Sequence, residues 1–179
     1  MGAHPDADRR EAFEQLFNAH YWAVRAYVLR RAPAASVEDV VADTFLVAWR
    51  RLDSLNEDPL PWLFGVARRV LPNQLRAERR RGALTTRLVS LLPARPPDWD
   101  PPAAMRHELA VAMVRLSPPE REALLLVAWE GLEPARAARA VGCSPAAFRG
   151  RLHRARRHVT AALADTPIAP RPSITGDAS

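Results

Sequence analysis

Arginine has the clearest chemical role in this sequence, because all 26 of its basic residues are arginine and none is lysine. A coding genome rich in G and C could also explain the missing lysine, so the positions of the arginines are more informative than their number. Seven arginines and no acidic residue lie between Pro134 and Ala164, a local formal charge of +7. Guanidinium groups suit phosphate oxygens and the guanine edge, whereas solvated helix faces usually mix both signs. This segment therefore predicts a nucleic-acid-binding surface.

A second basic run lies from Arg68 to Arg81, with six arginines against one acid, Glu78. Two aromatic residues, Trp62 and Phe64, precede it. Arginines combined with aromatic rings can hold a nucleic-acid backbone and stack unpaired bases. The spacing of the apolar residues favours a different role for Trp62, as part of a hydrophobic core. The run alone is a weak indication of single-strand binding.

Other residues that could bind a metal, act as a nucleophile or form a disulfide give weaker indications of function. The acids Glu38, Asp39 and Asp43 have no histidine beside them, and acids are expected in the first turn of a helix. Ser144 and His153 lack an identifiable third member of a nucleophilic triad. Cys143 is the only cysteine, so no intramolecular disulfide can form. We expect no catalytic residues, no metal and no cofactor.

The sequence also indicates where in the cell the protein is expected. The N-terminus, MGAHPDADRREAF, carries charges where a signal peptide would need an apolar core. Nowhere do 18 uncharged apolar residues follow one another. We expect a cytoplasmic protein without membrane insertion.

The basic segment has the pattern of a helix-turn-helix, in which two helices are joined by a short turn that includes glycine. The first helix is expected over 134–141 and the second from Pro145 to about Leu163. Gly142 can adopt the left-handed backbone that ends a helix, and Ser144 can cap the next one. Four apolar residues recur at steps of four, three and four and should share the buried face: Phe148, Leu152, Ala155 and Val159. The opposite face should present Arg149, Gly150, His153, Arg154, Arg156 and Arg157, with Arg136 and Arg139 on the preceding helix.

The remaining apolar periodicity predicts helices over 10–31, from Ser36 to Leu52 and from Trp62 onward. Pro72 should kink or end the third of these. A short helix over 105–116 precedes Ser117-Pro118-Pro119-Glu120, which has the serine and glutamate of a capping box. The segment LPARPPDWDPP, over 92–102, is typical of a stiff linker. We therefore predict an all-α fold of two small helical domains, over 10–82 and 104–164, joined by a proline-rich linker over 83–103 and followed by a disordered tail over 165–179.

Two motifs resemble the extracytoplasmic-function (group IV) sigma factors of bacterial RNA polymerase. VEDVVADTFLVAWRRL followed by PWLFGVARRVL resembles region two of that family. LSPPEREALLLVAWEGLEPARAARAVGCSPAAFRGRLHRARRHV resembles region four. The resemblance covers roughly residues 10 to 163.

The resemblance implies a protein that is not an enzyme, binds core RNA polymerase and promoter DNA, and has an anti-sigma factor as a partner. The C-terminal domain would recognise the minus 35 element as duplex, through Arg149, Gly150, His153, Arg154, Arg136 and Arg157. The N-terminal domain would help to melt and hold the minus 10 element, through Arg69, Asn73, Arg76, Arg79 and Arg80. The acidic helix would meet the polymerase through Asp39, Asp43 and Phe45. Family members often carry asparagine where Arg69 stands, so Arg69 and Pro72 could alter minus 10 recognition.

Two other functions fit part of this pattern. A polymerase-independent helix-turn-helix regulator would bind an operator alone, usually as a dimer on a palindromic site. A helical adaptor would bind polymerase or an anti-sigma protein without recognising a DNA sequence, and promoter selectivity would then survive the loss of Arg149 and Arg154.

Overall fold

The computed structural model describes residues 5–55, 57–80 and 103–164, and every regular element in these ranges is a helix. The all-α prediction is therefore confirmed for the part of the chain that is described. The elements are α1 (Pro5–Leu29), η1 (Ala34–Ser36), α2 (Val37–Arg50), η2 (Leu52–Ser54), α3 (Leu60–Arg80), α4 (Ala103–Arg115), α5 (Pro118–Ala128), α6 (Pro134–Val141) and α7 (Pro145–Ala164). The predicted linker and tail fall largely or wholly outside the described residues.

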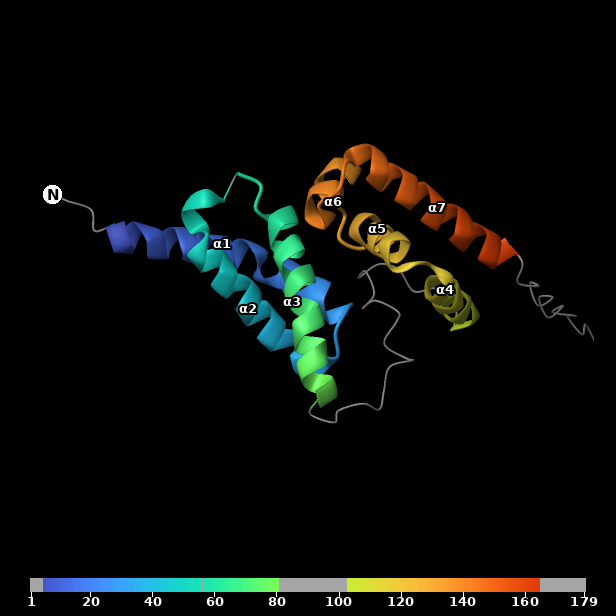
Figure 1. The fold of residues 1–179 in the computed structure, drawn as a ribbon, viewed down its shortest axis with the longest axis horizontal. Helices are drawn as coiled ribbons and strands as arrows, with labels where there is room; N and C mark the ends of the chain where they lie inside the picture. Colours follow the sequence, from blue (N-terminus) through green and yellow to red (C-terminus); the bar gives the residue numbers. More distant parts are fainter. Residues whose placement is uncertain (1–4, 56, 81–102, 165–179) are drawn as a thin grey trace, which may run out of the picture.

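The first group of helices, α1 to α3, packs around an aromatic cluster. Phe17 lies 4.7 Å from Phe45 between ring centroids, and the ring of Phe13 meets Trp49 edge-on at 5.2 Å. Tyr27 of α1 stacks on Phe64 of α3 at 4.6 Å. These rings fix the angle between α1 and the two helices that it crosses (Figure 1).

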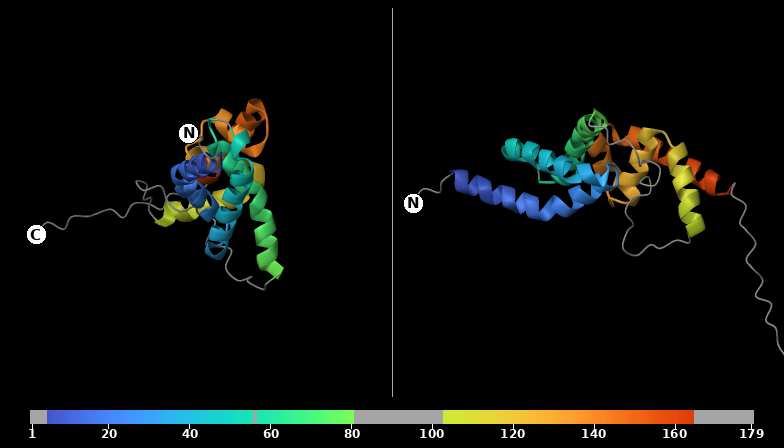
Figure 2. Two further views of the ribbon diagram at one scale, coloured as in Figure 1. Left: turned by 90° about the vertical axis from the view of Figure 1, so that its left-hand side faces the viewer. Right: turned by 90° about the horizontal axis from the view of Figure 1, so that it is seen from below.

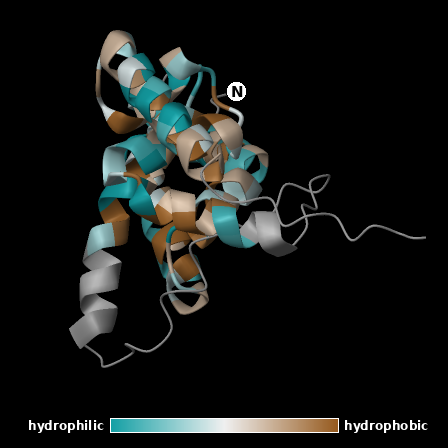
Figure 3. Cartoon of the chain, turned by 90° about the vertical axis from the view of Figure 1, so that its right-hand side faces the viewer, coloured by the Kyte–Doolittle hydropathy of each residue, from teal (hydrophilic) through white to brown (hydrophobic). Residues whose placement is uncertain are grey.

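The second group, α4 to α7, begins its second helix with the predicted capping box. The backbone N–H of Ser117 donates to Glu120 Oε2 at 3.2 Å, and the Ser117 hydroxyl donates to the same oxygen at 2.7 Å. Helix α6 ends at Gly142, whose φ of 68° is the left-handed conformation that glycine adopts without strain. The coloured parts of the helices carry both hydrophobic and hydrophilic residues, as expected of helices that are buried on one face (Figure 3).

The two groups share one hydrophobic core. Leu63, Phe64 and Ala67 of α3 belong to the same buried cluster as Leu126 of α5 and Ala140 of α6. Helix α3 lies beside α6 in each view (Figures 1 and 2). The contact is close enough that a methyl group added at Gly65 would come within 2.9 Å of the carbonyl oxygen of Ala140.

Two local predictions need correction. Helix α3 continues through Pro72 to Arg80, so of the two outcomes predicted for Pro72, a kink or a helix end, the helix end is wrong. Arg68 and Pro72 are both exposed, so the proline ring lies on the solvent side of the helix and not in the core. Ser36 precedes α2, as predicted, but its side chain makes no capping hydrogen bond.

Candidate nucleic-acid interface

Helix α7 has one buried face and one basic face. Phe148, Leu152 and Ala155 are buried against the neighbouring helices, as the periodicity predicted. The exposed side carries Arg149, His153, Arg154, Arg156 and Arg157, while Gly150 is partly exposed. Among the described residues, no acidic side chain forms an ion pair with Arg149, Arg156 or Arg157. The side chains of these three arginines are exposed on the surface of α7.

The turn between α6 and α7 sets the direction of this basic face. Gly142 reverses the chain after α6, and the N–H of Cys143 donates to the carbonyl of Ala138 at 3.1 Å. The Ser144 hydroxyl then accepts the N–H of Ala147 at 3.2 Å and caps the first turn of α7. The helix-turn-helix geometry is thus fixed by the residues that predicted it.

Arg154 differs from its neighbours because it has an acidic partner. Its Nε lies 3.5 Å from Glu120 Oε1, and His158 Nδ1 lies 3.7 Å from the other oxygen of the same carboxylate. Hydrogen bonding from Ser117 is the main cause of a lowered pKa for Glu120, which keeps this carboxylate ionised. Glu120 therefore both caps α5 and orients the Arg154 guanidinium on the surface of α7.

Arg136 and Arg139 of α6 bind a carboxylate from the first group of helices. Arg136 donates from Nε and Nη2 to the two oxygens of Asp58, at 3.0 and 2.6 Å, and Arg139 donates to the same carboxylate. The hydrogen bond from Arg136 is the main cause of a lowered Asp58 pKa, and it raises the Arg136 pKa in return. No local pattern predicts this pairing, because Asp58 lies in the loop before α3, 78 residues from Arg136.

The minus 10 candidates lie on one helix. Arg69 is exposed on α3, and Asn73, Arg76, Arg79 and Arg80 follow on its later turns. The aromatic residues before them have a structural role, because Phe64 is buried and Trp62 packs against the core. This agrees with the core interpretation of Trp62, which is partly buried, and excludes the buried ring of Phe64 as a stacking surface.

The polymerase candidates on α2 divide between surface and core. Asp39 is exposed and Asp43 is half-exposed. The inclusion of Phe45 was wrong, because its side chain is only 3% exposed and packs on the rings of α1. The apolar stripe of α2 turns position 45 inward, and the next residue, Leu46, is 46% exposed. Leu46 is thus an apolar surface residue that the sequence analysis missed.

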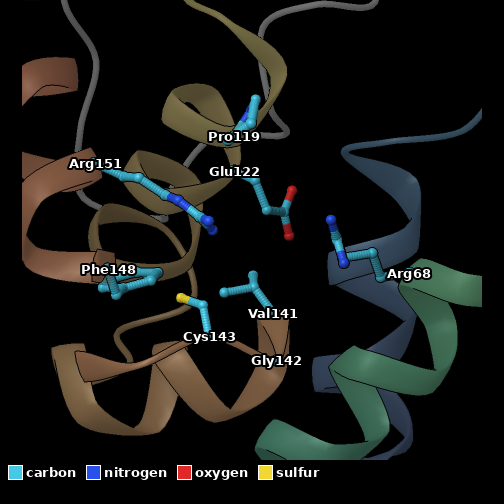
Figure 4. Close-up of a pocket in the computed structure, with 8 residues that line it drawn as sticks. All are labelled: Arg68, Pro119, Glu122, Val141, Gly142, Cys143, Phe148 and Arg151. Carbon is cyan, nitrogen blue, oxygen red and sulfur yellow. The ribbon is translucent and has the colours of Figure 1, made fainter. Parts of the chain in front are cut away.

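A cavity of about 210 Å³ lies at the junction of the two groups of helices. Its lining includes Arg68 of α3, Glu122 of α5, Arg151 of α7 and the thiol of Cys143 (Figure 4). The side chains of Arg68 and Glu122 extend toward it from opposite sides (Figure 4). The junction is therefore lined by charged groups at this point rather than closed by apolar packing.

The fold and this surface define a two-part helical protein with a DNA-binding helix-turn-helix in its second part. No helix among the described residues is long and apolar enough to cross a membrane. Comparison with known proteins then narrows the class. Residues 16–81 match sigma-70 region 2, and residues 106–159 match sigma-70 region 4.

Curated relatives match along nearly the whole chain. RNA polymerase sigma factor NccH of Alcaligenes xylosoxydans xylosoxydans is 33% identical, over 88% of this chain and 89% of its own. The ECF RNA polymerase sigma factor SigL of Mycobacterium tuberculosis is 30% identical, over 86% and 89%. Among solved structures, CnrH in complex with the cytosolic domain of CnrY has a TM-score of 0.62 at 28% identity, covering 88% of this chain and 91% of that one.

The chain therefore belongs to the sigma-70 family of RNA polymerase sigma factors, within its extracytoplasmic-function group. Its function is the promoter-specific initiation of transcription that defines a sigma factor. The polymerase-independent regulator is not favoured, because the match extends over the first group of helices as well as the helix-turn-helix.

Proposed function

We propose that this sigma factor recognises the minus 35 element with the basic face of α7 and the minus 10 element with α3. The observation that carries the proposal is the exposed set of arginines on a recognition helix that follows a glycine turn. Arg149, His153 and Arg154 are the candidates for contacts with base edges. Arg136 and Arg157 are the candidates for phosphate contacts, which position the helix without specifying sequence.

The two proposed DNA contacts also assign a role to each domain. Residues 10–82 would form the domain that binds core polymerase and the minus 10 element, and residues 104–164 the domain that binds the minus 35 element. Asp39 and Asp43 would meet the polymerase on the exposed side of α2. Leu46 replaces Phe45 in this set because it supplies an apolar contact on the same surface.

An anti-sigma factor is a further proposed partner. The similar solved structures of CnrH and of the Bartonella quintana sigma factor RpoE are complexes, with the cytosolic domain of CnrY and with the anti-sigma factor NepR. RpoE has a TM-score of 0.62 at 25% identity, over 86% of this chain and 97% of that one. The shared fold supports the same class of partner here.

Run-off transcription with core polymerase on a library of genomic fragments tests the proposal. The protein should yield discrete transcripts only together with core polymerase, and Arg149→Ala should reduce them selectively. Glu14→Ala, which changes an exposed residue of α1, is the control and should leave the transcript pattern unchanged. Operator binding by the protein alone, with no transcripts in the presence of core polymerase, would refute the assignment.

A further inference from the structure

Glu120 lies where two helices of the second domain meet, between the start of α5 and the middle of α7. Its side chain is only 11% exposed. Ser117 donates to Oε2 of this carboxylate from its backbone N–H at 3.2 Å and from its hydroxyl at 2.7 Å. The other oxygen, Oε1, faces α7, where Arg154 Nε lies 3.5 Å away. One carboxylate therefore connects the cap of α5 to an arginine of the recognition helix.

The Arg154 side chain extends along α7 toward the start of this helix. Its Nη1 atom lies 3.6 Å from the position that a Cβ atom would occupy at Gly150, which is one turn earlier. Long side chains on a helix usually point in this direction. Because Gly150 has no side chain, the guanidinium group can lie above its Cα atom. The position of the guanidinium is thus defined at two points, with Nε beside Glu120 and Nη1 beside Gly150.

This orientation leaves the guanidinium able to contact a base. A guanidinium group has five N–H donors, one on Nε and two on each terminal nitrogen. The carboxylate of Glu120 faces Nε, whereas bidentate binding to O6 and N7 of guanine can use the two terminal nitrogens. The Arg154 side chain is 53% exposed. Arg154 can therefore contact a base edge while its Nε remains beside Glu120.

The charge of Glu120 does not depend on Arg154. Hydrogen bonding from the Ser117 side chain is the largest cause of the lowered Glu120 pKa, and the charge of Arg154 is the smallest. His158, one turn after Arg154, has its Nδ1 atom 3.7 Å from Oε2, so it faces the oxygen that Ser117 also binds. The cap of α5 therefore holds an ionised carboxylate in place, with Oε1 directed at Arg154.

An arginine that is oriented in advance binds its target at a lower entropic cost. A long side chain loses rotamer freedom when it is fixed at an interface, and this loss weakens binding by a factor of about 2 to 13. A contact that fixes the side chain before DNA arrives removes part of this cost, but only for the geometry that the contact specifies. Partly exposed ion pairs contribute little to stability. The effect of this pair should therefore appear in base preference rather than in folding.

We propose that Glu120 is a positioning residue for minus 35 recognition, which orients the Arg154 guanidinium beside Gly150 before DNA binds, so that its terminal nitrogens meet one base pair. The inference rests on the proposed function of Arg154 as a contact with a base edge. It makes the specificity of this contact a property of two helices, because the cap of α5 fixes the carboxylate and α7 carries the arginine.

Glu120→Gln is the sharpest variant, because it separates the two roles of this side chain. The amide oxygen of glutamine can still accept hydrogen bonds from Ser117, as in the glutamine form of a capping box, but the charge that faces Arg154 is lost. Glu133→Gln is the matched control, since it removes an exposed carboxylate of the same domain that makes no capping hydrogen bond. Both variants should keep the helical circular dichroism of the wild type.

The assay uses the full-length chain with core polymerase on a promoter found by run-off transcription. Each base pair of its minus 35 element is replaced in turn, and the transcript yield is compared with that of the unchanged promoter. Arg154→Ala should remove a preference of about 5- to 160-fold at one base pair. Glu120→Gln should reduce the preference at the same base pair by a factor of about 2 to 13. Glu133→Gln should leave every preference unchanged.

The double variant that combines Glu120→Gln with Arg154→Ala distinguishes positioning from a general structural role. If Glu120 acts through Arg154, the double variant should have the same base preferences as Arg154→Ala alone. An equal loss at every base pair in Glu120→Gln, or a further loss in the double variant, would overturn the proposal.

The same measurements separate this proposal from the proposed base contact on which it rests. If Arg154→Ala flattens one base pair and Glu120→Gln keeps the wild-type preference there, the base contact stands and the positioning role is wrong. If Arg154→Ala changes no preference, the base contact itself is wrong, and the positioning role is overturned with it.

Discussion

Arg30 and Arg31, which follow α1, form a buried ion-pair cluster with Glu122 and Glu130, and replacing Glu130 by alanine should show how strongly this cluster holds the two domains together. Glu130 is 2% exposed and accepts hydrogen bonds from both Arg30 and Arg31. Its loss leaves Arg30, which is 9% exposed, without its carboxylate, whereas Arg31 keeps Glu122. Breaking a buried pair from one side costs about 3–5 kcal/mol, because one charge stays desolvated.

The variant has a way to avoid part of this cost, since opening the domains returns both arginines to water. The loss of stability measured for Glu130→Ala therefore has an upper limit. This limit is the free energy that holds the two domains together in the wild-type protein, because the variant can separate its domains instead of keeping Arg30 buried and unpaired. Wild-type protein should unfold in urea in one transition, because the domains share a core. Glu130→Ala should separate the unfolding of the two domains, with the first melting temperature lower by roughly 10 °C.

Urea and thermal unfolding followed by circular dichroism and tryptophan fluorescence measure both effects. Glu14→Ala removes an exposed carboxylate and serves as the control, with an expected change within about 0.5 kcal/mol. Glu130→Gln keeps the shape of the side chain but loses its charge, and should fall between the two. A Glu130→Ala protein that unfolds in a single transition with the stability of the control would refute the reasoning.

Three further predictions use the same structure. Arg149→Ala should weaken minus 35 binding by about 1–3 kcal/mol and relax the preference at one base pair, whereas Arg157→Ala should weaken binding to all sequences and reduce the salt slope by about one, as measured by fluorescence anisotropy. Leu46→Asp should weaken association with core polymerase in a pull-down while the protein stays folded, whereas Phe45→Ala should cost about 3–5 kcal/mol of stability. Burial lowers the pKa of His20, which lies near Asp58 and Arg136. The neutral His20 side chain therefore contributes to stability above pH 6.5, and this contribution is lost as the pH falls below that value through the lowered pKa. His20→Gln should therefore flatten the fall in the free energy of unfolding between pH 7.5 and 5.5, and an unchanged slope would contradict the assignment.

The helix-turn-helix could be predicted from sequence because its signals are local. Gly142 and Ser144 lie within three residues of the helix ends that they define, and the stripe from Phe148 to Ala155 repeats within one helix. The capping box at Ser117 and Glu120 is equally local. Each of these features depends on the backbone within one or two turns, which the residue types determine directly.

The error at Phe45 has a different origin. The apolar periodicity of α2 already placed position 45 on the buried stripe, but similarity to a family motif suggested a surface role. The structure follows the periodicity, because a phenylalanine packed on the rings of α1 stabilises the fold more than one in water. A motif identifies a helix, while its periodicity decides which of its residues reach the surface.

The contact between the domains could not be predicted from local pattern. Arg30 and Arg31 carry the same residue type as the arginines of α7, and nothing within one helical turn distinguishes an arginine that will be buried. The excess of acids between Asp98 and Glu133 was visible in the sequence, yet the partners of Glu122 and Glu130 lie about 90 to 100 residues away. Only the packing of the two domains on a shared core brings these residues together.

Burial therefore distinguishes arginines that can bind DNA from arginines that form ion pairs within the protein, a distinction that composition alone does not make. In α7 the guanidinium groups of Arg149 and Arg157 remain exposed, so an incoming phosphate replaces water and released counterions favour binding. At the end of α1, Arg30 and Arg31 are already desolvated and paired, so a phosphate would first have to displace a carboxylate. Arg136 and Arg139 lie between these extremes, with side chains 39% and 54% exposed and bound to Asp58. Exposed pairs of this kind are weak, so a phosphate meets a smaller barrier at Arg136 and Arg139 than at Arg30 and Arg31.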